Sequence, residues 1–259
     1  MLVFIGLGLY DHRDMTIRGL EEAKSCDLLF MEEYTSFLPG AGKRDIEAVV
    51  GRKIRSVSRR EVEDEGEEVI LEPAKISKVG FLVPGDPLIS TTHVYLRLRA
   101  EELGITTKVV HNASILSAAP SISGLQNYKF GRSASIPFPE EGFFPETPYD
   151  VLKENLQSDL HTLFYLDIKV EDGKIRAMRA REGVDYLLRI EDRRREGVFP
   201  DNKLCIALAG VGSSNPVIRA EVAGNLRSSR LGALPQCLIV PGKLHFMEEE
   251  YLRAFAGLR

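Results

Sequence analysis

One carboxylate in a rigid turn is the most chemically suggestive feature of the sequence. The continuous apolar run Val79–Val83 predicts a buried strand, and it ends at Pro84-Gly-Asp-Pro87. The two prolines fix the shape of this turn, Gly85 allows close backbone approach, and Asp86 adds the carboxylate. Residues 90–92 (Ser-Thr-Thr) then offer caps for a helix. In an open parallel sheet, ligands bind where a strand is followed by such a turn and a helix.

A second turn of this kind follows the first apolar run. Residues 2–5 predict a strand that ends at Gly6-Leu-Gly8, and a helix with an apolar stripe at Ile17 and Leu20 comes next. Glycine after a first strand favours a nucleotide-like ligand, but Asp11 stands where a dinucleotide fingerprint has its third glycine. A plain tight turn explains these glycines as well when they are taken alone. Their value comes from the pairing with the Pro-Gly-Asp-Pro turn.

The remaining candidate loops offer orientation rather than acid–base chemistry. Each follows a predicted strand, is rich in Gly, Pro, Ser, Asn or Asp, and lacks an evident nucleophile with a neighbouring base. P-loop, zinc-protease and nucleophile-elbow motifs are missing from the sequence. Such a site suits a reactive cofactor that the protein orients, and a sulfonium methyl donor fits because methyl displacement depends mainly on alignment. These loops are residues 112–115, 166–168, 209–216 and 240–245.

The composition is that of an ordinary globular protein. Among 259 residues, 44% are hydrophobic and 28% are charged, with a net charge of −4 from interleaved acids and bases. This pattern argues against a nucleic-acid surface. No run approaches the roughly 18 apolar residues of a membrane span, and the apolar start lacks the basic region of a signal peptide. The widely spaced Cys26, Cys205 and Cys237 predict buried, reduced thiols in a cytoplasmic protein, not metal ligands.

The order of the elements predicts an α/β protein in two domains. Residues 1–113 alternate strand-like and helix-like segments, which implies a mainly parallel sheet with helices on both faces. Residues 114–259 are expected to form a second α/β domain with a mixed sheet. There we predict a strand over residues 161–168, a helix capped by Thr147 and another helix that ends at Gly197. We expect two αβα domains whose loops face a shared cleft.

Short motifs spread over essentially the whole chain carry a family resemblance. Two are especially specific, Tyr128-Lys-Phe-Gly131 and Pro241-Gly-Lys-Leu-His245. The others are Gly6-Leu-Gly-Leu-Tyr-Asp11, Glu33-Tyr-Thr-Ser36, Pro84-Gly-Asp-Pro-Leu88 with Thr91-Thr-His93, Ser114-Ile115, Gly124-Leu125 and Leu166-Asp-Ile-Lys169. Together they resemble the diphthine synthase family of the tetrapyrrole methylase (class III) superfamily, of which the Gly-Asp-Pro turn alone marks only the superfamily.

This resemblance implies a fold, a cofactor and a protein substrate. S-adenosyl-L-methionine would bind in a folded conformation between two αβα domains of a homodimer and leave as S-adenosyl-L-homocysteine. The amino group of a modified histidine on translation elongation factor 2 would be methylated successively to diphthine, in diphthamide biosynthesis. The resemblance supplies no catalytic residue and no metal. Carried over residue by residue, it places the cofactor against Leu9, Asp86, Ile89, Ser114, Ile115, Leu166, Ala209 and His245.

Some positions depart from the family pattern, and some alternatives stay open. Ile89 is a mild variant of an apolar position, His12 stands where an acid is more usual, and Gly210-Val-Gly212 replaces Arg-Ala-Gly. Asp86 could organise its loop or act as a general base. The residues alone also allow a tetrapyrrole methyltransferase of the same superfamily, which no large aromatic cluster favours, or a non-catalytic nucleotide-binding module.

A surface near the cleft must accept a loop of the protein substrate. We predict its edge at three exposed residues, Phe143, Phe144 and Pro145, together with the segment Tyr128-Lys-Phe-Gly131. Packing of this loop against its own domain or a dimer partner is the alternative.

Overall fold

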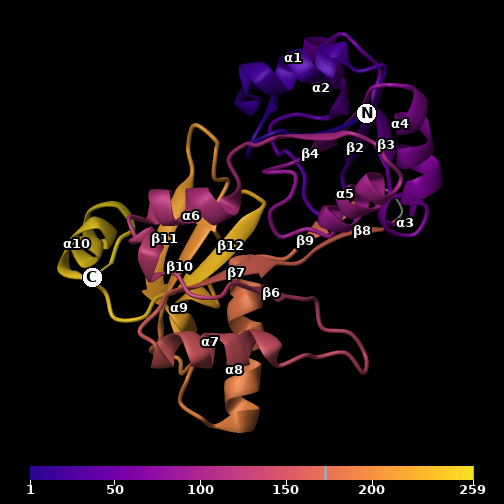
Figure 1. Cartoon of the computed structure of the whole chain (residues 1–259). Helices are drawn as coiled ribbons and strands as arrows, with labels where there is room; N and C mark the ends of the chain where they lie inside the picture. The colour runs from indigo at the N-terminus through magenta and orange to yellow at the C-terminus, as the bar shows by residue number, and fades with distance from the viewer. Residues whose placement is uncertain (172–173, 259) are drawn as a thin grey trace. The chain divides into compact units, whose positions relative to one another are not determined.

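Two five-stranded sheets organise the chain in the computed structural model, which describes residues 1–171 and 174–258. Each sheet belongs to one of two compact units, Met1–Ile115 and Leu116–Arg259. Strands and helices alternate along the first unit and are mixed along the second, so the predicted α/β class is confirmed. Figure 1 labels the elements.

The sheet of the first unit is entirely parallel. Parallel strands carry their carboxyl ends to the same edge, so the loops that follow neighbouring strands become neighbours too. The two turns found in the sequence follow β1 and β4, which pair directly, and β5 pairs on the other side of β1. The strand order is β3 (Arg55–Val57), β2 (Leu28–Glu32), β4 (Val79–Val83), β1 (Leu2–Gly6) and β5 (Thr107–Val110).

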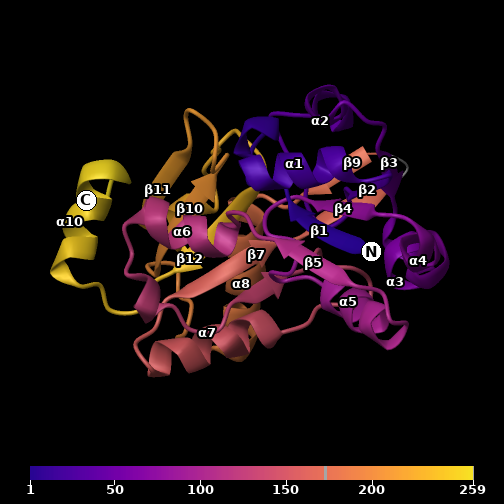
Figure 2. The ribbon, with the colours of Figure 1, turned by 45° about the horizontal axis from the view of Figure 1, so that its top comes forward.

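Both faces of this sheet are buried, which explains why its strands read as continuous apolar runs. Alternate residues point to opposite faces: Leu2 and Phe4 join one core cluster, and Val3 and Ile5 join the other. Figures 1 and 2 show α1 and α2 on one side of the sheet and α3, α4 and α5 on the other. The helical segments are η1 (His12–Asp14), α1 (Ile17–Ser25), α2 (Lys43–Val50), α3 (Arg59–Glu63), η2 (Glu67–Leu71), α4 (Glu72–Ile76) and α5 (His93–Glu102).

The sheet of the second unit is mixed. Its central strand β12 runs antiparallel to both neighbours, so β7 and β10 point the same way and β12 points the other way. The segment predicted as one strand over residues 161–168 contains β7 and then the start of a separate hairpin. The sheet order is β11 (Val217–Val222), β10 (Leu204–Ala209), β12 (Gln236–Val240), β7 (Thr162–Leu166) and β6 (Ala134–Ile136), and the hairpin is β8 (Ile168–Glu171) with β9 (Lys174–Ala177).

Helices α7, α8 and α9 pack one face of this sheet through a single large core cluster. Figure 2 shows α6 and α10 across the sheet from α7 and α8. Thr147 is the first helical residue of α7 and Glu146 is its N-cap, one residue before the predicted cap. Helix α8 ends at Arg194, with Arg195 in the left-handed conformation, and so stops before the predicted Gly197. The bounds are α6 (Ile115–Ser123), η3 (Asn127–Lys129), α7 (Thr147–Gln157), α8 (Ala180–Arg194), α9 (Ala223–Leu226) and α10 (Phe246–Phe255).

All three cysteines are buried free thiols, as predicted. Burial raises the pKa of Cys26 to about 11 and that of Cys237 to about 12, and it also raises the pKa of Cys205. Thiolates are therefore scarce near neutral pH. Over the described residues, no helix combines the length and apolar character needed to cross a bilayer.

Close packing of α8 on β7 gives a test of the second core. A Cβ on Gly183 would lie 2.7 Å from Leu166 Cδ2, whereas one on Gly224, also helical, would meet its nearest neighbour at an ordinary 3.4 Å. We expect Gly183→Ala to lower the free energy of unfolding by about 1–2 kcal/mol, because overpacking outweighs the helix-propensity gain. Gly224→Ala should be neutral or slightly stabilising. Equal effects in urea unfolding followed by circular dichroism would contradict this account.

Candidate functional site

The loops after β1 and β4 touch through their backbones. The Gly8 N–H donates to the Gly85 carbonyl (3.3 Å), and the Gly85 N–H donates to the Gly8 carbonyl (2.6 Å). Both residues have positive φ, 86° and 78°, where glycine is favoured. A Cβ on Gly6 would lie 2.6 Å from the Gly85 oxygen and 2.7 Å from Asn112 Cβ. The glycines of the two predicted turns therefore permit one continuous site.

Asn112 and Asp14 fix the third loop, which follows β5, to the first. The Asn112 side-chain amide donates to the carbonyls of Gly6 (2.9 Å) and Asp14 (3.0 Å). The Asp14 carboxylate accepts the amides of Leu9 (3.1 Å) and Tyr10 (2.7 Å). Asp14 was not among the residues predicted for the site, although short Asp and Asn side chains that bond to nearby backbone are typical of such turns.

Asp86 is nearly buried, at 7% exposure, and its carboxylate oxygens are occupied within the loops. Oδ1 accepts the amide of Leu88 (3.1 Å), and Oδ2 accepts the amide of Asn112 (3.2 Å). His111 Nδ1 lies 2.9 Å from the same Oδ2. Of the two roles left open for Asp86, these contacts favour organisation of the loops.

Strand β2 ends in a carboxylate with no exposure at all, Glu32, which binds the loop that follows. Its Oε2 accepts the amides of Tyr34 and Thr35, both at 3.1 Å, and its Oε1 accepts the Thr35 hydroxyl. Burial raises the pKa of Glu32 above its ordinary value, and these hydrogen bonds oppose the rise only in part. Glu32 thus holds the loop in place, although its burial destabilises the charged carboxylate relative to the protonated form.

His93 connects this loop to the Pro-Gly-Asp-Pro turn. Its Nδ1 lies 3.1 Å from the Pro87 carbonyl, which can only accept, so Nδ1 carries the proton. Burial lowers the pKa of His93, which favours the neutral ring. Nε2 is then the acceptor for the Tyr34 hydroxyl at 3.4 Å. The histidine of the Thr-Thr-His motif therefore has a structural role.

In the second unit, the strand directions separate the predicted site residues. Leu166 ends β7 and Ala209 ends β10, so both lie at one edge of the sheet, where their side chains are buried. Residues 241–245 follow β12, which points the other way, and His245 therefore lies beyond the opposite edge. There it is exposed and caps α10, its Nδ1 accepting the Met247 amide (3.3 Å). Cofactor contacts of these three residues stay predictions.

The two most specific sequence motifs meet around a buried pair, His161 and Glu248. His161 exchanges backbone hydrogen bonds with Lys129 (2.8 Å) and Gly131 (2.9 Å) of the first motif. Its Nδ1 accepts the Gly242 amide (3.1 Å) of the second motif, so its Nε2 carries a proton and donates to Glu248 Oε1 (3.1 Å). Burial lowers the pKa of His161. The residues of both motifs therefore have a structural role, since they hold the two segments against the buried His161.

The first unit brings most of its predicted site residues together. Leu9, Asp86 and Ser114 lie on three adjoining loops, and a Cβ on Gly85 would meet Ser114 Cβ at 3.7 Å. Ile89 is 41% exposed just beyond the turn. Ile115 opens α6. Their roles in binding stay predictions.

Three further residues singled out in the sequence are His12, Phe143 and Phe144. The buried Nδ1 of His12 has no hydrogen-bond partner within the described ranges. Phe143 is 52% exposed, whereas Phe144 is partly buried, its ring centroid 4.3 Å from that of Tyr186. The prediction that Phe144 and Pro145 are exposed was wrong, because Phe144 packs on the core of its own unit and the Pro145 carbonyl accepts the Tyr186 hydroxyl there. No group of three potential metal ligands occurs among the described residues.

Comparisons with known proteins give a consistent result over the chain. The sequence model of the tetrapyrrole (corrin/porphyrin) methylases matches residues 1–215. A diphthine synthase of Methanocella arvoryzae is 42% identical over 259 residues, covering 100% of this chain and 99% of that protein. One from Methanocaldococcus jannaschii is 44% identical over 253 residues, covering 98% of each. The crystal structure of a putative diphthine synthase from Entamoeba histolytica aligns with a TM-score of 0.90 at 37% identity, covering 99% and 98% of the two chains.

The buried Glu32 predicts an unusual dependence of stability on pH. Because its pKa is raised on folding, the folded state holds a proton above pH 4.5 that the unfolded state releases, so its contribution to stability falls as pH rises. In Glu32→Gln, the amide oxygen can accept from both backbone amides and the NH2 can donate to Thr35. We expect this variant to unfold at higher urea concentration than the wild type at pH 8, with the difference vanishing near pH 4. A variant less stable at pH 8 would show that the charge is needed.

Proposed function

The chain belongs to the tetrapyrrole methylase family and, within it, to the diphthine synthases, and from this premise we propose that it methylates a modified histidine of translation elongation factor 2. Its class is that of S-adenosylmethionine-dependent methyltransferases, and its pathway is diphthamide biosynthesis. We propose successive transfer to the amino group of the aminocarboxypropyl-modified histidine, by a homodimer. The observation that carries the proposal is the loop cluster after β1, β4 and β5, whose loops are joined by hydrogen bonds and offer no evident nucleophile–base pair.

The residues of this cluster fit the proposed cofactor. Leu9, Ile89 and Ile115 offer apolar contacts at the mouth of the loops, and Ser114 adds a hydroxyl beside Gly85. Asp86 keeps the loops in place, since its carboxylate already accepts hydrogen bonds from within them. Bound S-adenosylmethionine supplies an electrophilic methyl group on a sulfonium centre.

We propose that the protein contributes alignment rather than proton transfer. With S-adenosylmethionine bound, the site would align the neutral substrate amine with the methyl carbon, so that the N–C bond would form as the S–C bond breaks and an amine proton would pass to solvent. An amine with a pKa near the ordinary α-amino value of about 8 is partly neutral at pH 7. Proximity and orientation can account for about 7–11 kcal/mol of the barrier. No general base is required by this scheme.

Direct methyl transfer tests the proposed function. We expect the purified protein, incubated with labelled S-adenosylmethionine and elongation factor 2 halted at the aminocarboxypropyl-histidine stage, to add methyl groups to that histidine. Mass spectrometry of the modified peptide locates the label and counts the methyl groups. Cofactor binding without transfer to this acceptor would instead indicate another substrate within the superfamily.

Asp86→Asn separates loop organisation from base catalysis. Asparagine retains one acceptor but turns an NH2 group toward backbone donors, so we expect the dissociation constant of S-adenosylmethionine to rise about tenfold, about 1.4 kcal/mol. Turnover at saturating cofactor should stay within about twofold. Calorimetric titration and initial rates measure the two quantities. Asp192→Asn, at an exposed carboxylate of α8, serves as the control. Unchanged affinity with collapsed turnover would assign Asp86 as a base.

A further inference from the structure

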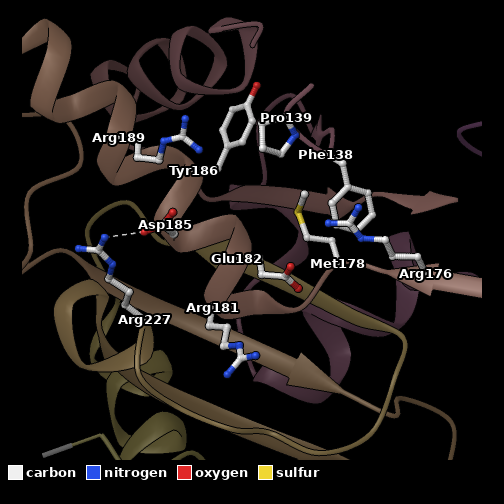
Figure 3. Close-up of a pocket in the computed structure, with 10 residues that line it drawn as sticks. All are labelled: Phe138, Pro139, Arg176, Met178, Arg181, Glu182, Asp185, Tyr186, Arg189 and Arg227. Carbon is white, nitrogen blue, oxygen red and sulfur yellow. Dashed lines mark ion pairs between the residues drawn. The ribbon is translucent and has the colours of Figure 1, made fainter. Parts of the chain in front are cut away.

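A cavity of about 350 Å³ opens on the second unit, beside the amino-terminal half of α8 (Figure 3). Its floor contains the buried Phe138, Met178 and Tyr186. Among the described residues, four arginines and two carboxylates surround this floor, and no lysine lines it. The chain as a whole has a net charge of −4, so this pocket is a local reversal of charge. We call it the arginine pocket.

Three of these arginines lack an acidic partner within the described residues: Arg176, Arg181 and Arg189. The fourth, Arg227, pairs with Asp185 at 2.6 Å, as Figure 3 shows. Farther along α8 the pattern differs, because Arg194 pairs with both Asp150 and Glu196. The pocket thus gathers three guanidinium groups without acidic partners in the described part of the chain, whereas Arg194 near the end of the same helix is paired.

Aromatic rings position two of these guanidinium groups without consuming their N–H donors. Arg176 lies over the ring of Phe138, its Cζ 3.9 Å from the centroid (Figure 3). Arg189 lies over the ring of Phe144, with Cζ at 4.7 Å. A guanidinium stacked in this way keeps its edge free for bidentate hydrogen bonds to a carboxylate or phosphate, at a reduced loss of conformational entropy. The guanidinium groups of Arg176 and Arg189 are therefore pre-organised to bind an anion.

The arginine pocket is also fixed to the end of β7, next to a predicted cofactor contact. Asp167 follows Leu166 and accepts the Phe138 amide through Oδ2 (2.9 Å). Its backbone carbonyl accepts the Met178 amide (2.8 Å). Two floor residues of the pocket thus depend on the residue after Leu166. A ligand in the pocket would be held beside this strand end.

We infer that the arginine pocket receives an acidic segment of the protein substrate, whose carboxylates pair with Arg176, Arg181 and Arg189. This inference rests on the proposed function, since it takes a whole folded protein as the acceptor. The volume suits a few side chains, and the basic surface is too confined for nucleic acid, which needs a basic face or stripe. Charge complementarity of this kind speeds association and selects the partner without entering the chemistry.

Charge reversal tests the inference. In Arg181→Glu/Arg189→Glu, we expect the KM for elongation factor 2 to rise at least tenfold, while kcat and the KM for S-adenosylmethionine stay within about twofold. The control Arg18→Glu/Arg230→Glu changes the net charge equally at exposed arginines outside the pocket, and should leave all three values unchanged. The wild-type KM for elongation factor 2 should also rise with salt more steeply than that of the pocket variant.

The possible failures are distinct. Absence of methyl transfer by the wild type overturns the proposed function and this inference together. An active pocket variant with an unchanged KM for elongation factor 2 overturns the docking inference alone. If that variant instead loses calorimetric binding of inorganic pyrophosphate, the pocket is a small-anion site and the docking inference is wrong. An equal rise of KM in the control would assign the effect to net charge, which also contradicts the inference.

Discussion

The mutual hydrogen bonds between Gly8 and Gly85 are the constraint on which the candidate site depends. They are possible only because β1 and β4 pair in parallel, which brings both strand ends to one edge. A side chain at Gly6 would separate the turns, and Asn112, which now bonds to the Gly6 carbonyl, would lose its place. Asp86 can bridge the second and third loops only after this approach is made. The side-chain hydrogen bonds of the site therefore depend on the close approach of the two backbones.

The second unit also holds its loops together by hydrogen bonds, but through buried side chains instead of glycine backbones. There the loops are held by a histidine and a carboxylate that are both fully buried, His161 and Glu248. The backbone amides of Gln126, Gly242 and His245 complete the hydrogen bonds of this pair. In both units, the polar groups near the loops are largely satisfied by the loops themselves. Such a framework suits alignment of a reactive cofactor, because few charges remain free to move during the reaction.

The sequence was most informative where glycine, proline and aspartate restrict the backbone, as in the turns after β1 and β4. The sequence did not predict strand β11, in which Ala220 is the only buried residue. It also did not predict the β8–β9 hairpin, because Lys169 and Arg176 interrupt the apolar pattern of these strands. The position of His245 could not be predicted, since the direction of β12 relative to its neighbours is absent from local sequence. The arginine pocket was missed for the same reason: Arg176 and Arg227 meet α8 only in the folded chain.

The buried thiols have a practical consequence. Cys26 lies in the first unit, whereas Cys205 and Cys237 lie on paired strands of the second. With pKa values raised by burial, none of them forms appreciable thiolate in the native state, so alkylation must await an opening of the surrounding structure. Each unit thus contains at least one native thiol whose reaction with an alkylating reagent depends on opening of that unit. The rate at which each cysteine becomes labelled reports how often that unit opens, without an introduced probe.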